Sequence, residues 1–175
     1  YNDRWQANLW NAMADLRTAR AGSGGFYTDD PQETINYVEK HDNETLFDAV
    51  QYKAPADATI QDRVRMSNLG ISLVLLSQGI PFFHAGDELL RSKSLDGNSY
   101  NSGDWFNRLD YTYQTNNWGV GLPNFRQDSW TLMADLLGNP ALQVAPEDIQ
   151  FSLDHFLEML KIRKSSPLFR LQTAE

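Results

Sequence analysis

Two short apolar segments, each followed by a run of polar residues, constrain the fold of this chain more than any other feature. Residues 34–38 and 80–83 are rich in β-branched and aromatic side chains, which is typical of short buried strands. Between them, apolar residues recur at the spacing of one helix face, at Met66, Leu69, Leu73 and Leu76. The order strand, helix, strand predicts a parallel βαβ unit.

This unit places polar residues together. We expect Asp57 or Thr59 to cap the helix, which should run to about Ser77 and end before Gly79. Neighbouring parallel strands end at the same edge of their sheet, so the polar runs after both strands should share one rim. In α/β folds that rim carries the functional site. The carboxylates and imidazole expected there are His41, Asp42, Asp87 and Glu88.

The rest of the chain divides into three helical patterns and a long loop. Apolar spacing predicts helices over residues 5–16, over 130–137 and after residues 146–148. The last of these carries Lys161, Arg163 and Lys164 in a final turn that favours positive charge. Residues 89–127 show no period. A loop of that length is uncommon and is usually functional.

Composition excludes several classes of function. The 23 acidic and 15 basic side chains give a net charge of -8, a poor match for nucleic acid. No run of about 18 apolar residues predicts a transmembrane helix. The absence of cysteine removes disulfides, thiol nucleophiles and thiolate metal sites. Nucleotide-binding, serine-hydrolase and zinc-protease motifs are also missing.

Carboxylates among exposed aromatic residues suit two kinds of chemistry, carbohydrate hydrolysis and binding of hard cations. Asp42, Asp87, Glu88 and Asp104 are the acidic candidates. Structural roles compete with these: the 87–88 pair can cap a helix or pair with Arg91, and most loop aromatics can form a small core of their own. We expect His84 to have a structural role, hydrogen-bonded near a packed strand end.

Several motifs resemble those of a known family. Residues 37–43 resemble the segment that ends barrel strand seven in the α-amylase family, and residues 79–88 resemble its strand-eight segment. Residues 98–108 narrow the resemblance to type I pullulanases and limit dextrinases, which cleave α-1,6 branch points. Residues 1–4 also resemble an element that these enzymes carry shortly before strand seven.

The resemblance implies a fold and a domain organisation. The expected fold class is α/β, a partial (β/α)8 TIM barrel with its last two strands, seven and eight, their helices and a long loop after strand eight. Residues 1–175 would form the C-terminal part of a catalytic barrel domain, with the start of a following domain at about 168–175. The chain has no initiator Met and no clear terminating element, so we expect a fragment.

The resemblance also assigns roles to individual residues. Asp42 would be the transition-state-stabilising carboxylate of three catalytic carboxylates, and His41 would donate a hydrogen bond to the same sugar. Asp104 and Arg108 would hold the next glucose toward the non-reducing end. Two further positions would shape the strand-eight rim without a chemical role, namely Gly86 and Glu88.

The implied function is hydrolysis of α-1,6-glucosidic linkages in pullulan, amylopectin and limit dextrins by a retaining mechanism. The nucleophile and acid/base segments are not among the matched motifs, so we expect the chain to be inactive without the rest of its barrel. No cofactor is required; the family leaves room for calcium, although no D-x-D-x-D-G loop occurs. Another α-amylase-family enzyme (a branching enzyme or α-amylase) and a non-catalytic α-glucan-binding module remain alternatives. The compartment and the oligomeric state stay open.

Overall fold

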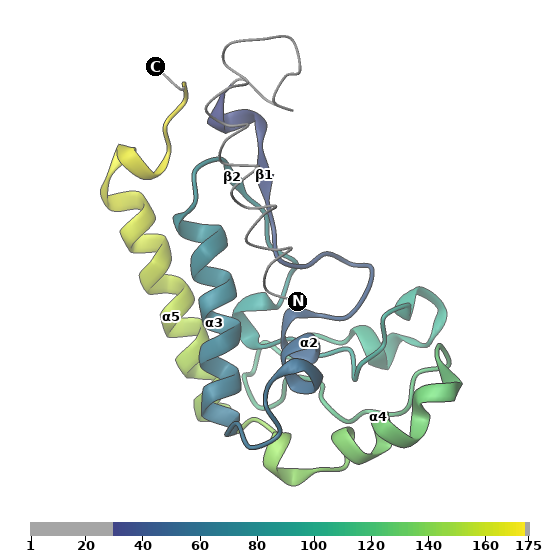
Figure 1. The fold of residues 1–175 in the computed structure, drawn as a ribbon. Coiled ribbons are helices and arrows are strands. Elements are labelled where there is room, and N and C mark those ends of the chain that lie inside the picture. Colours follow the sequence, from purple (N-terminus) through teal and green to yellow (C-terminus); the bar gives the residue numbers. More distant parts are fainter. Residues whose placement is uncertain (1–29, 174–175) are drawn as a thin grey trace, which may run out of the picture.

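The computed structural model describes residues 30–173, and two long helices form its frame. Helix α3 (Ile60–Leu76) and helix α5 (Pro146–Ser165) lie side by side, and α2 (Leu46–Lys53) packs against α3 (Figure 1). Helix α4 (Trp130–Leu137) lies below α2 in the view of Figure 1. The remaining regular segments are 3₁₀ turns: η2 (Pro31–Glu33), η3 (Asp87–Leu89), η4 (Ser99–Asn101), η5 (Asp104–Asn107), η6 (Gln127–Ser129), η7 (Pro140–Leu142) and η8 (Pro167–Phe169).

Two strands pair in parallel on either side of α3 in the sequence. Strand β1 (Ile35–Asn36) pairs with β2 (Ile80–Pro81), with Ile35 opposite Ile80. The Ile80 N–H donates to Thr34 O, and the Phe82 N–H donates to Asn36 O, each over 2.8 Å. The predicted parallel βαβ unit is therefore confirmed, and both strands end toward the same side of the molecule.

The expected partial TIM barrel is wrong. The part of the chain that the structure describes is mainly helical and contains only two parallel strands of two residues each. Pro81 has no N–H to extend the ladder, and the His84 N–H that follows β2 bonds to the Asp87 side chain instead of a third strand. An all-β glucan-binding module disagrees with the same observation.

The burial expected for the strands and for one helix face is also wrong. Ile35 is 59% exposed and Ile80 is 45% exposed. Leu69 and Leu73, on the predicted apolar face of α3, are 62% and 64% exposed. The buried face of α3 is a different one, because α2 and α5 pack against the side that carries Val64, Arg63, Ser67, Asn68, Ile71, Val74 and Leu75.

Local signals placed the helix ends well. Thr59 is the N-cap of α3, and its hydroxyl accepts a hydrogen bond from the Asp62 N–H at 3.2 Å. Helix α4 begins and ends as the sequence indicates, and α5 ends as expected but begins at Pro146, three residues earlier than predicted. Helix α2 is absent from the sequence prediction, although Thr45 caps it by accepting from the Asp48 N–H at 3.1 Å.

The main apolar core is formed by residues of the long loop together with residues of the helices. Phe47 of α2 meets Trp118 of the loop edge to face, with ring centroids 5.9 Å apart. The other buried members are Val64, Leu90, Leu95, Met133, Leu137 and Leu142. The aperiodic segment is thus ordered by packing, and only part of its aromatic set is buried, because Tyr100, Trp105 and Tyr111 are exposed.

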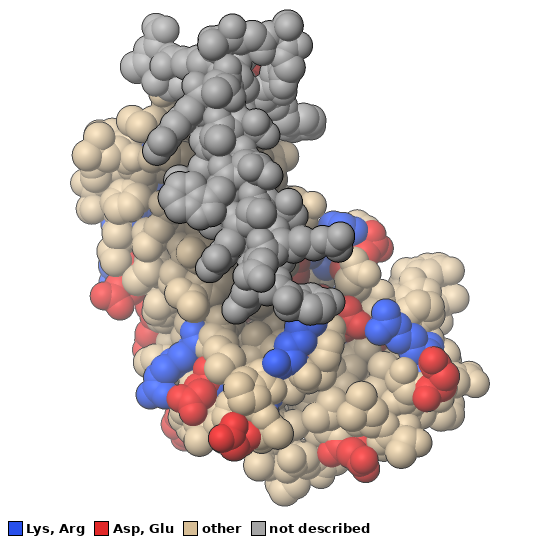
Figure 2. Space-filling view, viewed as in Figure 1, with Lys and Arg blue, Asp and Glu red and all other residues tan. Residues whose placement is uncertain are grey.

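Some of the sequence predictions concern residues that the structure does not describe. The helix predicted over residues 5–16 and the 1–4 element lie outside the described residues, and the domain organisation stays a prediction. No helix among residues 30–173 is long and apolar enough to span a membrane. On the face shown in Figure 2, acidic and basic side chains are interspersed between broad uncharged areas.

Candidate functional site at the ends of the two strands

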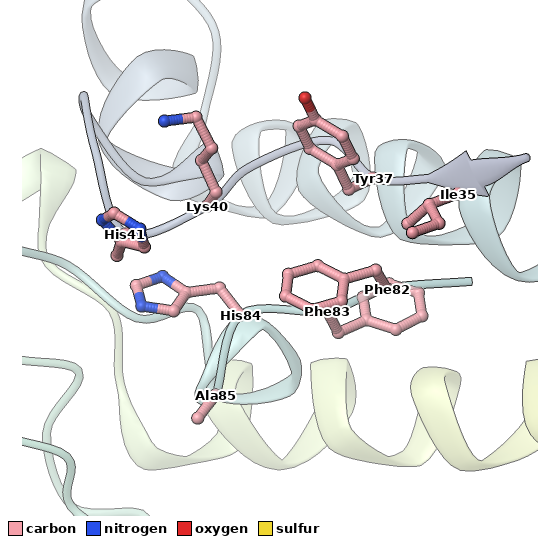
Figure 3. Close-up of a pocket in the computed structure, with 8 residues that line it drawn as sticks. All are labelled: Ile35, Tyr37, Lys40, His41, Phe82, Phe83, His84 and Ala85. Carbon is pink, nitrogen blue, oxygen red and sulfur yellow. The ribbon is translucent and has the colours of Figure 1, made fainter. Parts of the chain in front are cut away.

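A cavity of about 500 Å³ opens where the chain leaves β1 and β2. Figure 3 shows His41 and His84 facing each other at its polar end, with Ile35 and Phe82 at the other end. The Tyr37 and Phe82 rings meet edge to face, with centroids 6.4 Å apart. The full lining is Ile35, Tyr37, Lys40, His41, Phe82, Phe83, His84 and Ala85. Apolar walls with a few polar groups at one end are typical of small-molecule sites.

Asp42 lies exposed on the loop that leaves this cavity. Lys40 Nζ donates a hydrogen bond to Asp42 Oδ2, and His41 Nδ1 lies 3.2 Å from Asp42 Oδ1. The hydrogen bond from Lys40 lowers the pKa of Asp42, and the charges of Lys40 and His41 act in the same direction. Asp42 is therefore an ionised, solvent-accessible carboxylate at neutral pH.

The other two predicted site residues lie on η5. Asp104 begins this turn and Arg108 follows its last residue, and both side chains are exposed. Within residues 30–173, no hydrogen bond or ion pair connects either of them to His41 or Asp42. The indole of Trp105 lies over Gly103, where a Cβ would approach the ring to 2.5 Å. The assignment of Asp104 and Arg108 to a sugar subsite stays a prediction.

A buried network joins the two segments that leave the strands. Glu39, 6% exposed, accepts a hydrogen bond from His84 Nδ1 at 2.8 Å and another from the Leu46 N–H. Arg91 Nη1 donates to His84 Nε2 at 3.0 Å. Because a guanidinium can only donate, we assign the ring proton of neutral His84 to Nδ1. The expected structural role of His84 is confirmed, since it ties the polar run after β1 to η3.

Asp87, by contrast with Asp42, faces the protein interior. Its Oδ2 accepts from the His84 N–H at 3.1 Å. Burial raises the pKa of Asp87 to about 9, and the charge of Glu39 acts in the same direction. Asp87 is therefore protonated and uncharged at neutral pH. Glu88 instead accepts from the Gly86 N–H at 3.1 Å and shapes the turn.

Glu39 organises the polar rim, but it is absent from the site residues predicted from the sequence. The available signal was its position two residues after Tyr37, on the same side of an extended segment. A charged residue on the apolar side of a strand end is unusual unless a partner meets it. That partner, His84, is 45 positions away and could not be identified from local pattern.

Residues 30–173 contain no group of three or more His, Asp or Glu side chains placed to hold a metal ion. The carboxylates of the rim are separated by environment: Asp42 faces solvent and Asp87 is bonded inside the network. The calcium that the family resemblance allows gains no support from this part of the chain.

The family comparison adds to the geometry. Residues 113–175 match the model of the C-terminal region of pullulanase-type α-1,6-glucosidases. The chain is 55% identical over 150 residues to pullulanase 1, chloroplastic, of Arabidopsis thaliana, a match that covers 85% of this chain and 16% of the relative. It is 44% identical over 155 residues to a pullulanase of Klebsiella pneumoniae, covering 86% of this chain and 14% of that protein.

Comparison with solved structures agrees with these sequence matches. The crystal structure of the Klebsiella pneumoniae pullulanase complexed with maltotriose matches with a TM-score of 0.78 at 43% identity, over 87% of this chain and 15% of the other. The apo form of that enzyme gives a TM-score of 0.79 over 87% of this chain and 17% of the other. The chain thus spans about a sixth of the length of these relatives. From its motifs, its fold and these matches, the chain belongs to the pullulanase-type family of α-1,6-glucosidases.

Proposed function

We propose that this chain supplies part of the substrate site of an enzyme that hydrolyses α-1,6-glucosidic linkages in branched α-glucans. The observation that carries the proposal is the exposed Asp42 carboxylate, whose pKa Lys40 lowers, beside an aromatic-walled cavity of about 500 Å³. The similar Klebsiella pneumoniae pullulanase was crystallised with maltotriose, which supports an α-glucan as the ligand class. Pullulan, amylopectin and limit dextrins are the proposed substrates.

Asp42 has the properties of a transition-state-stabilising carboxylate. Glycoside hydrolysis passes through a transition state that resembles an oxocarbenium ion. An ionised carboxylate accepts hydrogen bonds from the sugar hydroxyls and attracts the positive charge that develops at the anomeric carbon. His41, whose side chain is 81% exposed beside Asp42, donates to a hydroxyl of the same sugar.

A second contact to the substrate is proposed at η5. The exposed Asp104 carboxylate accepts from sugar hydroxyls, and the Arg108 guanidinium donates to them. These two groups would hold the glucose that lies next to the one at Asp42, toward the non-reducing end. A bound glucan is long enough to contact both pairs of residues at once. The two pairs therefore need no direct contact with each other in the described chain.

The bond-breaking groups are proposed to lie in other parts of the protein. A retaining glycosidase needs a nucleophilic and an acidic carboxyl group about 5–5.5 Å apart. Asp42 cannot fill both roles, and the motifs matched in this chain correspond to neither. We therefore expect no turnover of pullulan by the 175-residue chain alone and turnover by the full-length protein.

Replacing the Asp42 carboxylate tests the proposal. In the full-length protein, Asp42→Asn should lower kcat on pullulan by about 10²–10³-fold, because the amide carries no charge to oppose the developing cation. Reducing-end release measures the rate. Asp154→Asn, which neutralises an exposed carboxylate on α5, is the matched control and should leave kcat unchanged.

Two results would contradict the proposal. Full activity in Asp42→Asn would remove this carboxylate from the reaction. Cleavage of amylose in place of pullulan by the wild-type protein would instead indicate an α-amylase specificity, so the two substrates are compared side by side.

A further inference from the structure

The segment from Ser92 to Asp96, which leads into Gly97, is buried although it belongs to the long loop. Ser92, Lys93, Ser94 and Asp96 are fully buried, and Leu95 is 4% exposed. Connecting segments normally run over the surface, where water satisfies their polar groups. A buried polar segment therefore needs partners for its own backbone, and it indicates a role beyond connection.

One buried carboxylate accepts three hydrogen bonds from this segment, two of them from its backbone. Asp48 of α2 accepts hydrogen bonds from Ser92 Oγ at 2.5 Å, from the Lys93 N–H at 2.9 Å and from the Leu95 N–H at 3.2 Å. The segment is also strained, because Ser94 and Leu95 have φ values of 50° and 65° in the left-handed region. Asp48 thus holds the segment in a conformation that its residues would not adopt alone.

From this fixed segment, two hydrogen bonds run to the residues on either side of Asp42. Lys93 Nζ donates to the carbonyl oxygen of His41 at 3.0 Å. The Asn43 N–H donates to the carbonyl oxygen of Gly97 at 3.0 Å. Among the described residues, the Asp42 side chain pairs only with its neighbours Lys40 and His41, so its position relative to the cavity depends on these backbone bonds.

Lys93 is costly to bury, which argues that the contact matters. Burial lowers the pKa of Lys93, because a buried ammonium loses its hydration, and the charges of Asp48 and Asp96 oppose that shift. An apolar side chain of similar length would fill the space without this cost. Only a long side chain with a terminal donor spans from the segment to the His41 carbonyl.

We propose that Lys93 is a positioning residue that fixes the Asp42 loop against the cavity, through its bond to His41 and together with the Gly97–Asn43 bond. The proposal rests on the function proposed above for Asp42. The long loop would then have a role in the site. Its segment held by Asp48 would set the position of the Asp42 carboxylate when a sugar binds.

The first test uses hydrogen exchange in the full-length protein and needs no substrate. Lys93→Met keeps most of the side-chain volume and removes the donor. We expect faster amide exchange in the peptide that contains residues 41–45 and unchanged exchange in peptides of α3 and α5. Lys161→Met, an exposed lysine of α5, is the matched control and should match the wild type throughout. Wild-type exchange over 41–45 in Lys93→Met would overturn the proposal.

The second test measures coupling to Asp42. Lys93→Met should lower kcat on pullulan by about 10–100-fold with little change in KM, since a displacement of about 1 Å costs up to 10²-fold. In an Asp42→Asn background the same substitution should cost no more than about twofold. Equal losses in both backgrounds would show a general structural effect and would overturn the positioning role.

A second variant covers the case in which Lys93→Met does not fold. Lys93→Gln keeps a polar end but is too short to bond His41 directly, so it should show the same exchange and kinetic changes. Failure of the proposed function has a separate signature: a wild-type protein without pullulan cleavage, or an Asp42→Asn variant with full activity. In either of those cases the exchange data still decide whether Lys93 fixes the loop.

Discussion

At the scale of one residue, the surroundings of a carboxyl group decide its protonation state, as two aspartates that follow neighbouring strands show. Asp42 points to solvent, and the hydrogen bond from Lys40 lowers its pKa. Asp87 points inward, and burial raises its pKa to about 9. Pairs of carboxyl groups whose environments push their pKa values apart are common where acids take different roles. Here the first is proposed to contact the substrate, and the second belongs to the buried hydrogen-bond network.

The protonated state of Asp87 leads to a prediction about pH. Its folded pKa of about 9 lies above the unfolded value of about 3.9, so its contribution to stability is full below pH 4 and is lost as pH rises toward 9. Asp87→Asn imitates the uncharged, protonated acid at every pH. Chemical denaturation of the full-length protein at pH 5 and pH 8 should show a smaller loss of stability in the variant. Equal losses in both proteins would mean that Asp87 is ionised in the fold.

At the scale of elements, one arginine joins α5 to the end of α3. Arg163 donates to the carbonyl oxygens of Leu75, Ser77 and Gly79, each at 2.7 Å. The last carbonyls of a helix have no partner within the helix, and these lie where the chain turns into β2. Gly79 has a φ of 94°, and a Cβ there would clash with Thr34 Oγ1. The turn that sets the strand pairing thus depends on Arg163 and Gly79 together.

Removing this arginine should therefore weaken the whole α3–β2 connection. We expect Arg163→Met to lower the free energy of unfolding by about 2–4 kcal/mol, because buried carbonyls lose a charged donor. Lys164→Met, at the exposed neighbouring position, should change it by less than about 0.5 kcal/mol. Denaturant titration of the full-length variants, followed by tryptophan fluorescence, measures both; similar values for the two would refute the capping role.

At the scale of the whole molecule, an apolar surface runs over α3 and the two strands. Leu69, Leu73, Ile35 and Phe82 are between 51% and 64% exposed. A cavity of about 350 Å³, lined in part by Ile35 and Leu73, extends along the same surface. Contiguous exposed apolar surface of this kind marks an interaction site. Since the chain spans about a sixth of the length of its relatives, we expect other parts of the protein to cover it.

A charge placed on this surface tests whether it is covered. In the full-length protein, Leu73→Glu should lower the free energy of unfolding by about 3 kcal/mol or more, because a carboxylate would be buried without a partner. Leu132→Glu alters a leucine of α4 with a similar exposure of 61%, outside this surface, and should change it by less than about 0.5 kcal/mol. A small effect at both positions would show that the α3 surface faces water in the complete protein.

The amino-acid sequence by itself determined the features that depend on a few neighbouring residues. A cap of α3 at one of two positions, Asp57 or Thr59, the C-terminal ends of α3, α4 and α5, and the parallel pairing of β1 and β2 follow from side-chain patterns and turn chemistry. The polar rim after the two strands follows from that pairing. These signals act over one or two turns of the chain, so they can be read without the fold.

Only the tertiary structure decided which faces are buried and which polar groups act together. The apolar face predicted for α3 is the exposed one, and the expected partial barrel is not what the described residues form. Three hydrogen bonds join residues that are far apart in the sequence. His84 bonds to Glu39 over a separation of 45 residues, Lys93 to His41 over 52 residues, and Arg163 to Leu75 over 88 residues. Burying a charged group is favourable only where a partner meets it, and that meeting depends on how distant segments pack.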